Sequence, residues 1–152
     1  MLWITAALIS AQAQQQPEKQ GREKLLEKKL NYLREKLMLN DREFVVFEQE
    51  FKSFETQRWK LFRQKKQILQ TLRGNKTANL SDKEIADKLK HLRKLERSLF
   101  ELKDKHFERI QNILPPRKAL QYWKYSLQFN KMLLKKRKTH RRKTGEKSDG
   151  HR

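Results

Sequence analysis

Apolar residues recur every three or four positions over two stretches of about 30 residues, and this spacing constrains the fold more than any other feature. The first stretch has phenylalanines at 44, 47, 51 and 54 and resumes with Leu61, Ile68 and Leu72. The second contains Ile85, Leu89, Leu92, Leu95, Leu99, Leu102, His106, Ile110 and Ile113. A spacing of three and four places such residues on one face of an α-helix. Two long amphipathic helices are therefore predicted.

Short signals mark the ends of these helices. Asn40 with Glu43, and Ser81 with Glu84, have the spacing of a capping box at a helix start. Gly74 fits a C-terminal cap for the first helix, and a polar loop is expected over residues 74–80. Pro115-Pro116 ends the second helix and favours the first turn of another.

Two further helices are expected on either side. Leucines at 26, 30, 33 and 37 predict a helix over residues 18–39. A last helix over residues 117–138 presents Leu120, Trp123, Leu127, Phe129 and Leu134. Four glycines and three prolines are too few for a turn-rich β fold. We predict an all-α, elongated, four-helix hairpin-like bundle with its helical domain at 24–138. The apolar content of 36% suits a thin structure, and a homodimer would cover its stripes.

The first thirteen residues are apolar and end in Ala11-Gln12-Ala13, a small-x-small pattern typical of signal-peptide cleavage. The missing basic n-region indicates a start codon further upstream, so residues 1–13 are interpreted as an N-truncated signal peptide cleaved after Ala13. Residues 14–23 then form a polar leader. This predicts a periplasmic protein. The alternative is an apolar chain end with an accidental Ala-x-Ala.

The formal net charge of +20 favours anionic partners. The densest basic run comprises Lys135, Lys136, Arg137, Lys138, Arg141, Arg142 and Lys143. Residues 139–152 are expected to be a disordered basic tail. In the cytoplasm this run would indicate nucleic-acid binding. In an exported protein it would bind an anionic membrane surface or acidic clients, and the plainest alternative is a solubilising tail without a specific partner.

A second candidate surface interleaves aromatic rings with cations. Its members are Arg58, Trp59, Phe62, Arg63 and Lys66. Rings beside positive charge suit unfolded polypeptides, which expose apolar and acidic groups. They equally suit single-stranded nucleic acid, whose bases stack on rings. These five residues are the predicted client-binding residues, and the compartment decides between the two uses.

Catalytic and metal-binding patterns are missing from the sequence. There is no cysteine and no glycine-rich phosphate loop, and Ser53, Ser98 and Ser126 have no histidine at helical spacing to act as a base. His106 lies on an apolar stripe, where we predict a packed, hydrogen-bonded side chain rather than a metal ligand. We expect neither enzymatic activity nor a cofactor nor a metal site.

The ordered motifs resemble those of the small exported helical proteins of the Spy/CpxP type. The resemblance is strongest to the Bacteroidetes branch described as sensors of ECF-type sigma factors or periplasmic heavy-metal sensors. It rests on Leu39-Asn40-Asp41-Arg42-Glu43, on Leu80-Ser81-Asp82-Lys83-Glu84 and on Ile113-Leu114-Pro115-Pro116-Arg117-Lys118. It implies a thin, curved helical dimer that holds unfolded clients or docks on a membrane-bound regulator, with Leu39 and Leu114 fixing helix turns.

The preferred hypothesis is a non-enzymatic periplasmic envelope-stress protein. It would act as an ATP-independent chaperone, or as a sensor or adaptor that binds one regulatory protein. The alternative is a cytoplasmic, basic, helical nucleic-acid-binding protein. A third hypothesis is a helical adaptor that only bridges two proteins.

Overall fold

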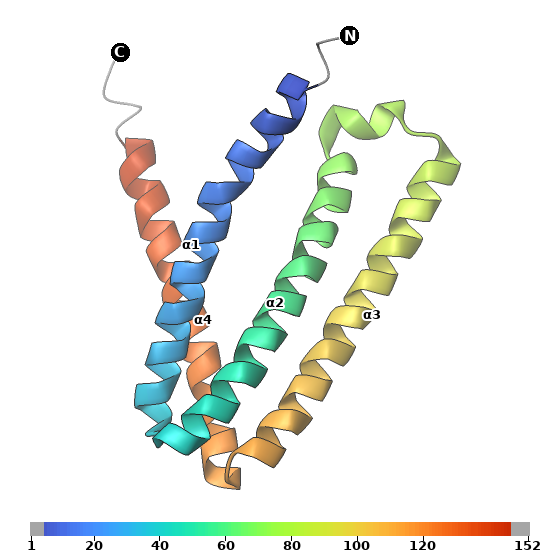
Figure 1. Cartoon of the computed structure of the whole chain (residues 1–152). Coiled ribbons are helices and arrows are strands. Elements are labelled where there is room, and N and C mark those ends of the chain that lie inside the picture. Colours follow the sequence, from blue (N-terminus) through green and yellow to red (C-terminus); the bar gives the residue numbers. More distant parts are fainter. Residues whose placement is uncertain (1–4, 147–152) are drawn as a thin grey trace. The chain divides into compact units, whose positions relative to one another are not determined.

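The computed structural model describes residues 5–146, and within them the side chains of residues 20–74, 77–139 and 142. The helices are α1 (Thr5–Leu37), α2 (Asp41–Thr71), α3 (Asp82–Ile113) and α4 (Pro116–Glu146), with a short 3-10 helix, η1 (Gly74–Asn79), between α2 and α3 (Figure 1). The described residues contain no strand, and the predicted all-α fold with four helices is confirmed.

The chain divides into two compact units, and the helical domain predicted over residues 24–138 includes parts of both. Residues 40–115 form one unit, which consists of α2, η1 and α3. The other unit combines residues 1–39 with residues 116–152, so α1 packs with α4 although the whole first unit separates them in sequence. We call residues 40–115 the central hairpin.

The core of the central hairpin is the predicted phenylalanine stripe. Phe47, Phe51 and Phe54 are buried on α2, and the first two rings stack with centroids 5.7 Å apart. The buried residues of α3 are Leu95, Leu99, His106 and Ile110. Contacts across the pair join residue 50 to 106 and residue 65 to 96, so the helices run antiparallel, side by side (Figure 1).

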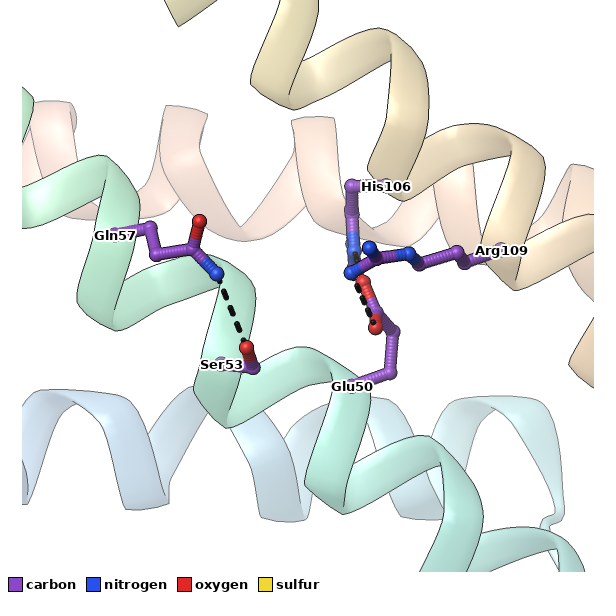
Figure 2. Close-up of polar contacts among 5 residues, drawn as sticks. All are labelled: Glu50, Ser53, Gln57, His106 and Arg109. Atoms are coloured by element: carbon purple, nitrogen blue, oxygen red, sulfur yellow. Dashed lines mark hydrogen bonds and ion pairs between the residues drawn. The ribbon is translucent and has the colours of Figure 1, made fainter.

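Two residues of α3 make polar contacts with Glu50 of α2 across this pair of helices (Figure 2). The Nδ1 of His106, whose side chain is 5% exposed, lies 2.9 Å from Oε1 of Glu50. The Nη1 of Arg109 lies 3.2 Å from the other oxygen of the same carboxylate, and the imidazole stacks on Phe54. The prediction of a packed, hydrogen-bonded His106 is confirmed, with its partner on the facing helix.

Both predicted capping boxes are present. The Asn40 side chain accepts from the Glu43 N–H at 2.9 Å, and the Glu43 carboxylate accepts from the Asn40 N–H at 3.0 Å. Ser81 and Glu84 repeat this exchange at the start of α3. Gly74 is not the predicted cap of α2, because Leu72 takes that position. Gly74 instead has φ 62° and opens η1, so the polar loop predicted over residues 74–80 contains a short 3-10 helix.

The second unit packs α1 against α4. Leu30, Leu33 and Leu37 are buried on α1, as are Ala119, Tyr122 and Phe129 on α4. The Tyr32 ring contacts Phe129 at 5.3 Å between centroids. The Lys118 Nζ donates to the Met38 carbonyl at 3.1 Å. This bond ties the start of α4 to the end of α1.

The outer ends of α1 and α4 differ from the expected boundaries. α1 begins at Thr5, not near residue 18; residues 1–4 of the predicted signal peptide lie outside the described residues, and cleavage after Ala13 stays a prediction. α4 continues to Glu146, which replaces the disordered tail expected from Thr139. Lysine and arginine tolerate helix interiors well, and the Thr139 hydroxyl bonds back to the Lys136 carbonyl at 2.9 Å. Residues 147–152 of that tail are not described.

Within the described residues, no helix is long and apolar enough to cross a lipid bilayer.

Candidate functional site

Charge is segregated along the central hairpin. Residues 58–98, which include η1 and the adjoining halves of α2 and α3, contain 13 Lys and Arg against 4 Asp and Glu. The remaining residues, 40–57 and 99–115, contain 5 Lys and Arg against 8 Asp and Glu. The antiparallel pairing brings the two basic halves to the same end. We call residues 58–98 the basic hairpin end.

The apolar side chains of the central hairpin are more deeply buried in its acidic half than in its basic half. The fully buried phenylalanines lie in the acidic half, at positions 47 and 51. In the basic hairpin end, Leu95 is the stripe residue that is buried, and most of the others are only half-buried; these include Leu61, Ile68, Leu72, Ile85 and Leu92. A thin two-helix layer cannot enclose them. Apolar surface therefore stays accessible beside the cations.

The five predicted client-binding residues lie together on α2. Arg58, Phe62 and Lys66 follow one another at four-residue steps, so they share a row on the helix. Trp59 and Arg63 form the adjacent row, with the guanidinium carbon of Arg63 5.4 Å from the centre of the indole ring. We call these five residues the α2 patch.

The side chains of the α2 patch differ in how exposed they are and in how many contacts they make with other residues of the chain. Arg58 is half-buried: its Nε donates to Glu55 at 2.9 Å, and its guanidinium lies 5.5 Å from the Phe62 ring centre. The Phe62 side chain is 43% exposed, and Arg63 and Lys66 are exposed. The Arg58 guanidinium is therefore paired with Glu55 and lies near Phe62, while the ring of Phe62 is accessible to a partner.

α3 adds cations that were not identified from the sequence. An open groove of ≈ 570 Å³ lies between α2 and α3. Leu61 and Gln64 line its α2 side, and Lys90, His91 and Lys94 line its α3 side. On a neighbouring face of α3, Leu89 is 48% exposed and lies among Lys90, Arg93, Lys94 and Arg97. The basic hairpin end therefore combines cations with accessible apolar groups on α3 as well as in the α2 patch.

The few acidic residues of this end leave it strongly cationic. Glu96 pairs with Lys65 at 2.8 Å, and Asp87 lines the groove together with His91. The Ser81 backbone N–H and then its hydroxyl donate to Glu84 and lower the pKa of that carboxyl. In the part of the chain that the structure describes, no three His, Cys, Asp or Glu side chains lie close enough together to bind a metal ion.

The predicted anionic-surface-binding run, 135–143, forms the C-terminal part of α4. Lys135, Lys136, Arg137, Lys138 and Arg142 are exposed there. The side chains of Arg141 and Lys143 are outside the part that the structure describes. The run belongs to the other unit and is not part of the basic hairpin end.

Comparison with known proteins gives no match: no family model fits the chain, and no curated protein or solved structure is significantly similar to it.

Proposed function

We propose that this protein is a non-enzymatic, exported chaperone that holds unfolded polypeptides on the basic hairpin end. The observation that carries the proposal is the exposed Phe62 ring between cations, beside stripe residues that are only half-buried. An unfolded chain offers apolar side chains together with carboxylates, and this surface is complementary to both. Compact native proteins bury their apolar groups and would bind it weakly.

Two physical effects would act in sequence. The excess of 13 cations over 4 anions attracts acidic segments from a distance and raises the association rate. Apolar contacts with Phe62, Leu89 and the groove between α2 and α3 then retain the client. A loosely packed helix pair can adjust to many client sequences. Neither effect requires ATP or a cofactor.

A sensor or adaptor would use the same surface for one folded regulator. The two roles differ in selectivity: a chaperone suppresses aggregation of many clients, whereas an adaptor binds one protein with a fixed stoichiometry. Export and dimerisation belong to the same proposal. N-terminal sequencing from fractionated cells tests the first, with Gln14 as the expected first residue, and sedimentation velocity tests the second.

The apolar contribution is tested with Trp59→Ala/Phe62→Ala in an aggregation assay. The matched control is Val45→Ala/Val46→Ala, which removes apolar groups that are 64% and 50% exposed at the acidic end of the same helix. We expect the first variant to suppress aggregation of reduced α-lactalbumin several-fold less well than wild type, with unchanged helicity by circular dichroism. The control should match wild type. Equal suppression by all three proteins would remove the α2 patch from the proposal.

The charged contribution is tested with Lys90→Glu/Lys94→Glu against Lys103→Glu/Lys105→Glu, which makes the same change among exposed lysines of the acidic half. The first variant should lose activity toward acidic reduced α-lactalbumin more than toward basic reduced lysozyme. The alternative function, nucleic-acid binding, predicts tight binding of a single-stranded oligonucleotide whose log K falls steeply with log salt. Such binding together with no effect on aggregation would favour the alternative.

A further inference from the structure

α4 carries a second apolar stripe that does not face α1. Its buried residues, Ala119, Tyr122 and Phe129, pack in the unit with α1. A second set of apolar residues begins one position after Ala119. Its members are spaced by three, four and seven residues, so they lie on one face of the helix. Its members and their exposed fractions are Leu120 at 70%, Trp123 at 53%, Leu127 at 47% and Leu134 at 58%. We call these four residues the outer stripe.

A row of cations runs along one edge of the outer stripe. Arg117, Lys124, Lys131 and Lys138 are all exposed and recur every seven residues, which is about 10 Å along a helix axis. Each of the three leucines is followed four residues later by one of these lysines, so each leucine has a cation as its helical neighbour. α4 as a whole has 11 Lys and Arg and a single acidic residue, Glu146.

We infer that α4 is a peripheral membrane-binding element: the outer stripe inserts into an anionic lipid surface and the cation row pairs with the lipid phosphates. Helices that lie in the plane of a membrane interface combine leucine and tryptophan on one face with Lys and Arg beside it. The inference concerns binding at the surface and not a membrane span. It does not depend on the proposed chaperone function, which uses the other unit.

Two other kinds of partner would fit the outer stripe less well than a lipid surface. A second copy of α4 would bring two strongly cationic helices together, and their repulsion opposes that pairing. A coiled-coil partner needs apolar residues at both the a and d positions of each heptad. With the leucines of the outer stripe at a, the d positions are Trp123, Asn130 and Arg137. A lipid surface requires only the stripe and its flanking charge.

The face of α4 that packs with α1 can keep its contacts during binding. Lys118 donates a hydrogen bond to the Met38 carbonyl, and Phe129 contacts Tyr32. Lys118 and Phe129 both lie on the side of α4 that packs with α1. The outer stripe is rotated from this face by about 100°, the angle of one residue in a helix. Binding therefore does not require α1 and α4 to separate.

The test measures binding of the full-length protein to phosphatidylcholine vesicles with and without about 30% phosphatidylglycerol. We expect binding only to the anionic vesicles. Lys124→Gln/Lys131→Gln/Lys138→Gln should weaken it about a hundredfold, at about fivefold for each cation. The control, Lys28→Gln/Lys103→Gln/Lys105→Gln, removes three exposed charges elsewhere and should have a far smaller effect. Equal weakening by both variants would overturn the inference, because it would show an effect of net charge alone.

Two neutral changes test insertion separately from charge. Leu127→Gln/Leu134→Gln should weaken binding by about tenfold for each leucine, whereas Val45→Gln/Val46→Gln should not. Binding should also shift tryptophan emission to the blue in wild type and in Trp59→Phe but not in Trp123→Phe. An unchanged affinity in the leucine variant, or oligonucleotide binding through the cation row without vesicle binding, would overturn the assignment to lipid.

Discussion

His106 on α3 donates a hydrogen bond to Glu50 on α2, with 2.9 Å between Nδ1 and Oε1. The carboxylate can only accept, so the proton lies on Nδ1. The two side chains are 5% and 12% exposed, and Arg109 donates to the second carboxylate oxygen at 3.2 Å. This contact fixes the register of the central hairpin at its well-packed half, because a shift of either helix would leave both groups buried without partners.

The first prediction follows from that geometry. His106→Phe keeps a ring that can stack on Phe54 but removes the donor to Glu50, and we expect it to lower the free energy of unfolding by about 1–2 kcal/mol. Glu50→Met alone should cost a similar amount. The double variant should recover much of the loss, because it replaces both partners by apolar groups. Urea unfolding followed by circular dichroism measures all three, and strictly additive losses would contradict the coupling.

A second prediction concerns the end of α1. The Leu39 N–H bonds to the Arg34 carbonyl and the Met38 N–H to the Glu35 carbonyl, both at 3.2 Å. This is the Schellman pattern, in which the residue at C′ adopts a left-handed conformation that favours glycine. Met38 occupies that position with φ 49°. Met38→Gly should therefore raise the free energy of unfolding by about 1 kcal/mol.

Met38→Ala is the control for this substitution. It removes the same side chain, which is 82% exposed, but alanine tolerates positive φ no better than methionine does. Thermal unfolding should show a higher melting temperature for the glycine variant and little change for the alanine variant. A gain in both variants would mean that the exposed side chain, and not the backbone conformation, is the source of the cost.

A third prediction concerns two hydroxyls in the packing of α1 with α4. Tyr32 Oη and Ser126 Oγ are buried, with no hydrogen-bond partner in the described part of the chain. Tyr32→Phe retains the ring that contacts Phe129 and Tyr125 and removes an unsatisfied polar atom. We expect it to raise the free energy of unfolding by about 1 kcal/mol. A loss of stability at neutral pH would contradict this reading of the contact.

The same substitution should change the alkaline behaviour. Burial, and then the neighbouring Tyr125, raise the pKa of the Tyr32 phenol above its usual value. A raised pKa in the folded state gives stability below the unfolded pKa, and this stability is lost as the pH rises through the folded value. The advantage of Tyr32→Phe over wild type should therefore grow as the pH rises above about 10. Urea unfolding at several pH values measures this difference.

Local sequence signals were sufficient to predict the central hairpin. The two capping boxes and Pro115-Pro116 act over four residues or fewer, so the starts of α2, α3 and α4 could be predicted without any tertiary contact. Where no such signal exists, the boundaries were less accurate. The end of α1 was predicted at Leu39 and lies at Leu37, where Met38 rather than a glycine follows the helix. No residue before Gly145 interrupts the helix propensity of the basic run, so α4 extends beyond the expected boundary.

To predict which residues of two helices contact each other, the register of the helix pair must be known, and hydrophobic periodicity alone does not determine it. The α2 patch was visible because its aromatic and basic residues are adjacent in sequence. Lys90 and Lys94 of the same end are distant in sequence from that patch, and folding two antiparallel helices of equal length around the 74–80 turn would have indicated them. The pairing of α1 with α4 has no comparable signal, because 76 intervening residues, 40–115, form a unit of their own.

The last prediction is a pH dependence at the start of α3. Glu84 Oε2 accepts from the Ser81 backbone N–H and from its hydroxyl, both at 2.8 Å, and these bonds lower the pKa of the carboxyl. A lowered pKa in the folded state gives stability above the unfolded value, about 4.5, and this stability is lost as the pH falls through the folded value. We therefore expect α3 to fray from its first turn in acid.

Nuclear magnetic resonance titration of the Glu84 carboxyl tests this directly. In Ser81→Ala the backbone donor remains and the hydroxyl is lost, so the pKa of Glu84 should move part of the way back toward its ordinary value; in Ser98→Ala, on the same helix, it should not move. Glu84→Gln should remove the acid-dependent fraying altogether, because its side chain no longer ionises. If the pKa of Glu84 is the same in Ser81→Ala as in wild type, the capping bond does not control its ionisation, and the acid sensitivity of α3 must come from another carboxyl.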